Sequence, residues 1–451
     1  MCIVILYRFK HIIFYRLSNT LKYFSVHMQM ENRELESINK MFRDDRVLNT
    51  INKMFISLQQ QKVQTINAFL QLVIETLIKG MKENDSLFRK MYKKIIYCGS
   101  FYKGTKIGEP NEFDLNIILK IPIDYYYINF YPISPGYVEL SITDKRAYDR
   151  VEIHHLTHKE KKTLDRLITD DILNPNHFRW WIKSIVDQVI DKLPEFGNGR
   201  ELLLNNSFKA RIKKSESGPA ITLIINIPYQ NECIYISIDL VPALSFDIAV
   251  AERLTTKFHI LKECRNKEWF AIPISEKDSY FDTSFRWRLS FSHQENEMLE
   301  KYGPVKPIIR LIKKLRDTQN WKNIASYYIE TVCLNKLTEC NMDINKTTQT
   351  LFFFTMLKEL HYALDEHKIK YFWNEDHNLL CRFHNIQISN IANHLKRIIN
   401  DIIRKHAEDD LILAKYILNP VELSLLKEKI NEPSEETNAA KNTTNNYCTI
   451  F

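Results

Sequence analysis

The sequence predicts a soluble α+β protein in which a mixed α/β half is followed by a helical half. The 451 residues, 45% hydrophobic and 26% charged, suit a globular protein of two or three domains or two large lobes. Strand-like segments and one long amphipathic helix precede residue 290, and helical periods follow it. Only 9 glycines and 14 prolines exclude a collagen-like or linker-like chain. No apolar run approaches the roughly 18 residues that span a membrane.

The first half begins with a long helix, predicted over residues 63–90 because its apolar positions keep helical spacing. Residues 93–98 and 114–121 each predict a short strand. Residues 220–227 and 232–241 predict two more strands, and the turn residues 228–231 between them indicate a hairpin.

Helical periods in the second half lie near residues 293–302, 305–316, 324–340, 348–364, 389–406 and 410–418, with Gly303-Pro304 and Pro420 as stops. We therefore divide the chain into an N-terminal extension, partly unstructured or helical (1–55), a mixed α/β lobe with its long helix (56–290), a helical lobe (291–430) and a polar disordered tail (431–451). Residues 1–30 lack the unbroken apolar core of a signal peptide. Two interpretations of these residues remain open: a surface-seeking amphipathic helix and a non-structural extension.

The charge and the cysteines set loose limits on partners and location. Lys+Arg 63 against Asp+Glu 55 gives a net charge of +8, which a solvated surface explains as well as an anionic partner does. The eight cysteines are scattered and form no CxxC pair. Cys381 between His377 and His384 is a weak zinc signal. We expect free thiols and a cytoplasmic location.

Residues 98–119, CGSFYKGTKIGEPNEFDLNIIL, carry most of the chemistry. Along a strand Glu112 and Asp114 point to one face, with Phe113 turned into the core. Two adjacent carboxylates repel each other unless a cation lies between them, and such hard oxygen ligands suit Mg²⁺. The turn at Gly99-Ser100 offers backbone N–H groups and a hydroxyl to a polyphosphate.

A third acid, Asp239, lies in the otherwise apolar segment YISIDLVPA. A lone carboxylate buried there is costly, and a satisfied core or strand-end aspartate is the alternative interpretation. On a strand next to Glu112 and Asp114, it completes a three-carboxylate, two-metal site.

This pattern resembles the DNA polymerase β-like nucleotidyltransferase superfamily: a Gly-Ser turn, an acid pair on one strand and a third acid on a neighbour. Further segments occur in the order seen in cyclic GMP-AMP synthase and its animal relatives: GSFYKGTKIGEPNEFDLN, WRLSFSHQENEML (287–299), KPIIRLIKKLR (306–316) and SYYIET (326–331). Over roughly residues 60–420 the chain resembles the insect cyclic GMP-AMP synthase-like receptors. The resemblance implies a bilobal nucleotidyltransferase fold, a mixed β-sheet catalytic lobe with a long spine helix plus a C-terminal helical lobe.

The resemblance also implies roles for individual side chains around the nucleotides. Arg288 reads a base edge, Tyr327 stacks on a base, and Ser326 contacts phosphate. The base and ribose pocket and a further nucleotide contact are assigned to Ser290, Ser292, Glu295 and Lys313. From spacing alone, Ser292 and Glu295 also form an S-x-x-E capping box at a helix start.

The resemblance implies two Mg²⁺ or Mn²⁺ ions, ATP and GTP as substrates, and a cyclic GMP-AMP-type product in innate antiviral immunity. The vertebrate synthase carries a zinc loop after the segment that matches His293, whereas here no cysteine lies between His293 and the helix that begins near Lys306. We therefore expect no structural zinc. Insect relatives without this loop respond to double-stranded RNA, so the resemblance implies an RNA activator rather than DNA. A phosphate-binding surface, for which a merely solvated basic face is the alternative, is assigned to Lys209, Arg211, Lys213, Lys214 and Lys314.

Two other functions stay open at this point. A nucleic-acid-binding or interaction protein on the same fold without catalysis is the main alternative. An RNA-tailing enzyme or oligoadenylate synthase is the other, and WRLSFSH and SYYIET argue against it. Sequence alone leaves the oligomeric state and the phosphodiester linkage undetermined.

Overall fold

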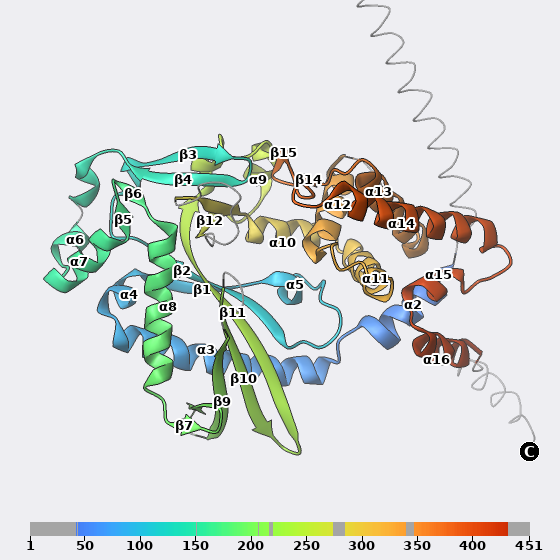
Figure 1. The fold of residues 1–451 in the computed structure, drawn as a ribbon, viewed down its shortest axis with the longest axis horizontal. Coiled ribbons are helices and arrows are strands. Elements are labelled where there is room, and N and C mark those ends of the chain that lie inside the picture. The colour runs from blue at the N-terminus through green and yellow to red at the C-terminus, as the bar shows by residue number, and fades with distance from the viewer. Residues whose placement is uncertain are drawn as a thin grey trace, which may run out of the picture.

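The computed structural model describes residues 42, 44–149, 151–205, 207–215, 220–273, 285–339 and 347–431. A sheet-containing lobe and a helical lobe lie side by side (Figure 1), so the predicted α+β architecture is confirmed. Our interpretations of residues 1–30 and of the tail beyond 431 lie outside the described residues. Within the described ranges no helix is long and apolar enough to cross a membrane.

The sheet lobe is built on one large mixed sheet. Its principal strands are β1 (Tyr92–Cys98), β2 (Glu112–Leu119), β3 (Ile128–Ser134), β4 (Tyr137–Ile142), β8 (Gly199–Leu204), β9 (Phe208–Ser215), β10 (Ile221–Tyr229), β11 (Glu232–Asp247), β12 (Glu268–Pro273) and β13 (Trp287–Ser290). Short strands β5 (Ile168–Thr169), β6 (Ile172–Leu173) and β7 (Glu195–Phe196) extend it. β2 lies between β1, which is antiparallel to it, and β11, which is parallel to it. The predicted β10–β11 hairpin is confirmed.

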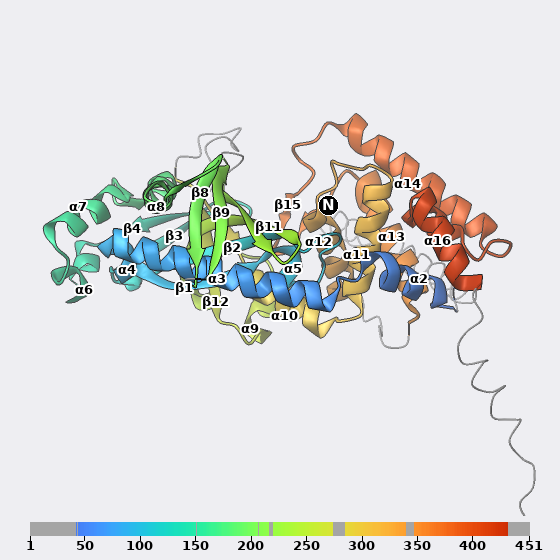
Figure 2. The same ribbon diagram turned by 90° about the horizontal axis from the view of Figure 1, so that it is seen from below.

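Two long helices, α3 (Gln60–Asn84) and α8 (Pro175–Asp191), pack against the sheet lobe, and α3 extends toward the helical lobe (Figure 2). The prediction of one helix over 63–90 is wrong at its C-terminal end. Asp85 is extended, and its carboxylate accepts a hydrogen bond from the Phe88 amide. This cap starts a separate helix, α4 (Ser86–Met91), because a side-chain acceptor replaces the missing helical carbonyl.

The helical lobe contains all six helices that the periodicity predicts: α10 (Ser292–Lys301), α11 (Val305–Thr318), α12 (Ser326–Glu339), α13 (Gln349–Asp365), α14 (Asn385–Lys405) and α15 (Ile412–Ile417). A further helix, α16 (Pro420–Asn431), begins at the proline that we interpreted as a stop. Proline is tolerated in the first turn of a helix, where its missing N–H has no intrahelical partner.

Short elements complete the two lobes. The helices are α5 (Gly99–Tyr102), α6 (Val151–His154), α7 (His158–Arg166), α9 (Phe258–Glu263), η2 (Tyr125–Tyr127), η3 (Lys145–Tyr148) and η4 (Ile248–Ala251), and the hairpin β14 (Lys370–Tyr371) and β15 (Asn374–Asn378) lies in the helical lobe. Part of the segment that we assigned to an N-terminal extension also joins this lobe, as α2 (Arg46–Ile51) and η1 (Asn52–Ile56). Leu48, Ile51 and Ile56 are buried there.

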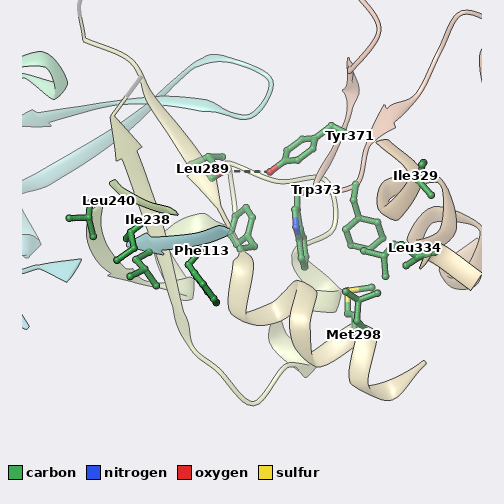
Figure 3. Close-up of a cluster of buried hydrophobic side chains, with 14 of the residues drawn as sticks. Phe113, Ile238, Leu240, Leu289, Met298, Ile329, Leu334, Tyr371 and Trp373 are labelled. Carbon is green, nitrogen blue, oxygen red and sulfur yellow. Dashed lines mark hydrogen bonds between the residues drawn. The ribbon is translucent and has the colours of Figure 1, made fainter. Parts of the chain in front are cut away.

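A continuous apolar core joins the lobes (Figure 3). Phe113, Ile238 and Leu240 come from β2 and β11, while Trp373 follows β14 and Met298 lies on α10. The Tyr371 hydroxyl, on β14, donates to the Leu289 carbonyl of β13 at 3.5 Å. Burying a side chain of this size stabilises the fold by about 1.5–3 kcal/mol, so the core fixes how the lobes face each other.

Candidate active site

The three predicted carboxylates lie on one face of the sheet. Asp239 of β11 is directly opposite Asp114 of β2, and Glu112 is opposite Ser237 two positions away. Directly paired residues share a face, and successive residues alternate, so all three acids point the same way. Phe113 between the two β2 acids is 2% exposed, as the alternation predicts.

Each carboxylate has different surroundings. Glu112 is 72% exposed and pairs with the Lys106 ammonium at 2.6 Å. Asp239 accepts a hydrogen bond from the Thr222 hydroxyl at 2.6 Å. Burial and then the charge of Asp239 raise the pKa of Asp114. Mutual repulsion of this kind is relieved when a cation binds between the acids.

No group of three or more His, Cys, Asp and Glu side chains in the described ranges has an arrangement that could hold a metal. Because Glu112 pairs with Lys106, it would have to leave this partner to join the two aspartates. The donor chemistry nevertheless fits Mg²⁺ or Mn²⁺, since all three side chains offer hard oxygen ligands from two paired strands. The two-metal site therefore stays a prediction, with Glu112, Asp114 and Asp239 as its ligands.

The turn after β1 brings backbone against the acids. Gly99 has φ +75°, and a Cβ atom placed on it would lie 1.9 Å from Oδ2 of Asp114. Only glycine combines this backbone conformation with so close an approach. The turn then continues as α5.

A cavity of about 480 Å³ opens beside Asp114, between the sheet and the helical lobe. Its lining includes seven of the predicted site residues: Gly99, Asp114, Arg288, Ser290, Ser292, Glu295 and Tyr327. The other five residues predicted to bind nucleotide or metal lie outside this lining: Ser100, Glu112, Asp239, Lys313 and Ser326. The cavity thus joins the acid face of the sheet to the predicted base-binding residues.

The predicted capping box at Ser292 and Glu295 is wrong. Phe291 is the N-cap residue and no side chain caps the helix. The Glu295 carboxylate instead accepts hydrogen bonds from the Tyr327 hydroxyl at 2.9 Å and the Trp373 indole N–H at 3.0 Å. It also pairs with Lys103 at 2.8 Å, and these three buried donors hold it away from the helix start.

Two predicted nucleotide contacts have internal partners. Lys313 is 2% exposed, and its ammonium donates to the Thr105 carbonyl at 2.7 Å. Burial lowers the pKa of Lys313 to about 8, with the Glu330 carboxylate acting in the opposite direction. The Ser326 hydroxyl accepts a hydrogen bond from Arg316 at 3.0 Å.

The low pKa of Lys313 predicts a pH-dependent stability. Between pH 8 and 10.5 the unfolded chain binds more protons at this lysine than the folded chain does, so the free energy of unfolding gains a contribution that rises with pH. We expect the unfolding free energy of the wild type, relative to Lys313→Met, to increase by about 3 kcal/mol across this window. Urea titrations at several pH values measure it. If the unfolding free energies of the wild type and Lys313→Met change with pH in parallel, the low pKa of Lys313 is contradicted.

The five basic residues predicted to bind phosphate do not form one free surface. The ammonium of Lys214 pairs with Asp187 and Asp191 on α8, and Lys314, on α11, pairs with Glu422. Lys209 pairs with Glu201 at 3.2 Å. Strand pairing places Lys209, Arg211 and Lys213 on the same sheet face as Asp239, because Ser215 and Thr222 continue that row.

Several cavity residues were missed by the sequence analysis: Lys103, Tyr137, Tyr371, His377 and Arg382. Lys103 lies inside the motif we singled out, and its position among uncharged neighbours was the available signal. His377 had been noted only for a weak zinc signal with Cys381, which also lines the cavity, and the spacing around the other three carries no signal. Burial and the nearby Arg382 lower the pKa of His377, so this ring is neutral near pH 7.

Comparison with known proteins defines the class of this fold and site. The family described as the Mab-21 protein nucleotidyltransferase domain matches residues 101–301. The Mab-21 protein HhH/H2TH-like domain matches residues 304–397. The chain therefore contains a nucleotidyltransferase domain followed by its helical partner domain, which confirms the predicted fold.

Individual relatives define the family more narrowly. A cyclic GMP-AMP synthase-like receptor of Microplitis demolitor is 34% identical over 425 residues, covering 92% of this chain and 76% of the relative. The receptor of that name from Aethina tumida is 31% identical over 405 residues, covering 89% and 98%. One from Trichogramma pretiosum is 33% identical over 410 residues, covering 89% and 81%. The chain belongs to the family of cyclic GMP-AMP synthase-like receptors.

Proposed function

We propose that this protein is a nucleic-acid-activated cyclic dinucleotide synthase of the cytoplasm. It joins ATP and GTP into a cyclic GMP-AMP-type messenger for innate antiviral defence, and double-stranded RNA is its activator. The observation that carries this proposal is the pairing of Asp114 with Asp239 beside Gly99, at the edge of a cavity that also holds Arg288 and Tyr327.

The side chains divide the work of nucleotide transfer. Arg288 and Tyr327 line the cavity and supply a planar donor and an aromatic ring for the bases. Gly99 lets the backbone approach the triphosphate near Asp114, and Ser100 adds a hydroxyl to the same turn. Two Mg²⁺ or Mn²⁺ ions held by Glu112, Asp114 and Asp239 would activate the attacking ribose hydroxyl and neutralise the pyrophosphate leaving group.

A catalytically silent binding protein on the same fold is the second candidate. Such a protein has no need of a glycine forced against an aspartate or of repelling carboxylates on adjacent strands. Asp114, with its raised pKa, and Gly99 both favour the enzyme. The two candidates differ in one outcome, which is turnover of nucleotides.

Resistance of the product to phosphatase tests the proposal. Purified protein is incubated with ATP and GTP labelled at the α-phosphate, Mg²⁺ or Mn²⁺, and an RNA duplex. A cyclic dinucleotide keeps both labelled phosphates through phosphatase treatment, a linear dinucleotide keeps only its internal one, and unreacted nucleotides keep neither. The mass of the resistant product then distinguishes the ring from the linear dinucleotide. Absence of resistant label with every metal and duplex contradicts the proposal.

The activator side of the proposal makes a separate prediction about Lys213. Phosphate contacts release counterions, so duplex affinity falls with salt at a log–log slope of roughly −0.9 per contact on B-form duplex. Lys213 is the residue to change, because reversing Lys214 would also break its ion pairs with α8. We expect Lys213→Glu to weaken RNA duplex binding and flatten the salt slope by about one contact.

Lys161→Glu on α7 is the control for this experiment, since it makes the same charge change at an exposed site on another part of the surface. If both variants weaken duplex binding equally, the change in net charge alone explains the effect. RNA duplexes are expected to stimulate synthesis more than DNA duplexes of equal length. Equal stimulation by DNA would contradict the choice of activator.

A further inference from the structure

Lys103 lies at the centre of a buried charge cluster that joins the two lobes. Its ammonium pairs with the carboxylates of Glu295 on α10 at 2.8 Å and of Glu330 on α12 at 3.0 Å. The three side chains are 12%, 9% and 5% exposed in these pairs. Although burial alone would lower it, the two carboxylates raise the pKa of Lys103, so the ammonium stays charged.

The cluster holds the turn that carries Gly99. The Lys103 amide donates to the Gly99 carbonyl at 3.2 Å, and Thr105 donates from its amide to the Ser100 carbonyl at 2.8 Å. Thr105 also reaches the helical lobe, because its hydroxyl donates to Glu330 at 2.8 Å. Lys103 and Thr105, whose amides close the turn on Gly99 and Ser100, thus attach it to α12.

The same cluster holds two walls of the cavity. Glu295 and Tyr327 line it, and the Tyr327 hydroxyl donates to the Glu295 oxygen that Trp373 also contacts. Lys103 binds the other oxygen of Glu295, and its ammonium lies 5.5 Å from the centre of the Tyr327 ring. Without the ammonium, Glu295 and Glu330 would be two buried carboxylates lacking their shared cation.

We propose that Lys103 is a positioning residue that fixes the Gly99-Ser100 turn and the Glu295–Tyr327 pair as one unit. The turn meets the triphosphate and the pair meets the base, so their relative position sets the geometry of the bound nucleotide. The effect of this role on catalysis rests on the proposed function. The coupling between the turn and the helical lobe does not, because it exists without substrate.

Lys103→Met tests the coupling, because it keeps an unbranched side chain of nearly the same length and removes the charge. We expect amide hydrogen exchange in residues 103–111 to become about tenfold faster in the absence of nucleotide. In the active protein, KM for ATP and GTP should rise about tenfold, because the base wall and the phosphate turn no longer align. Lys103→Arg, which keeps a cation, should restore most of both properties.

Lys257→Met is the matched control, because it also replaces a buried lysine between the lobes with methionine. Lys257 is 6% exposed and donates to Asn335 of α12 at 3.1 Å, but it does not line the cavity. The Lys257→Met variant should be less stable than the wild type. Its amide hydrogen exchange in residues 103–111 and its KM for ATP and GTP should not change. Equal effects of Lys103→Met and Lys257→Met would overturn the proposal.

If Lys103→Met does not fold, the double variant Lys103→Met with Glu330→Gln removes one of the two uncompensated charges. Its exchange in residues 103–111 should stay fast and its nucleotide affinity low, because Glu295 still lacks its cation. Wild-type exchange and affinity in this variant would overturn the role of Lys103. A wild type that binds no ATP or GTP would instead contradict the proposed function. The hydrogen-exchange result would still test the coupling between the turn and the helical lobe.

Discussion

Asp239→Asn is expected to abolish product formation, with a loss of activity of about three orders of magnitude or more. The carboxamide keeps the size of the side chain and can still accept the hydrogen bond from Thr222. It removes the negative charge that the proposed metal site needs opposite Asp114. The double variant Glu112→Gln with Asp114→Asn should have the same effect, measured as the initial rate of cyclic product formation.

Asp247→Asn is the control on the same strand, since Asp247 is the last residue of β11, outside the cavity lining. It should retain activity. All variants should keep RNA duplex binding and near-wild-type thermal unfolding. Substantial activity in Asp239→Asn would remove the basis for the two-metal assignment.

Gly99→Ala has the second largest expected effect. An alanine Cβ would overlap Oδ2 of Asp114 at 1.9 Å, so either the turn or the aspartate must move. A displacement of about 1 Å at reacting groups costs on the order of 100-fold in rate, and we expect at least this loss of product. The positive φ adds about 1–2 kcal/mol of strain, which denaturant titration measures.

Gly108→Ala separates these two contributions. Gly108 has φ +76° in the same loop, and nothing lies within 4 Å of its added Cβ atom. This variant should show a similar loss of stability with activity close to wild type. If both variants lose activity equally, the close approach of Gly99 to Asp114 is not what matters.

The sequence predicted the elements whose signals are local. The β10–β11 hairpin and helices α10 to α15 follow from alternation, helical period and turn residues over short windows. The position of Asp239 opposite Asp114 could also be predicted, because a carboxylate inside an apolar strand is costly unless it has a partner or a function.

Contacts between distant segments were beyond the sequence. Lys103 meets Glu295 across 192 positions and Glu330 across 227, and no spacing rule joins them. The same contact explains why Glu295 does not cap α10, although its spacing from Ser292 is correct. β9 was not predicted, so the opposite faces of Lys213 and Lys214 could not be assigned.

The mass of the product made from ATP and GTP decides whether this protein is a cyclic dinucleotide synthase that depends on Asp239. Wild-type protein, Mg²⁺ or Mn²⁺ and an RNA duplex are incubated in parallel with Asp239→Asn under the same conditions. The wild type is expected to form a product containing one AMP and one GMP unit joined in a ring, and the variant is expected to form none. Only unreacted nucleotides in the wild-type sample, or the same product from both proteins, would contradict this expectation.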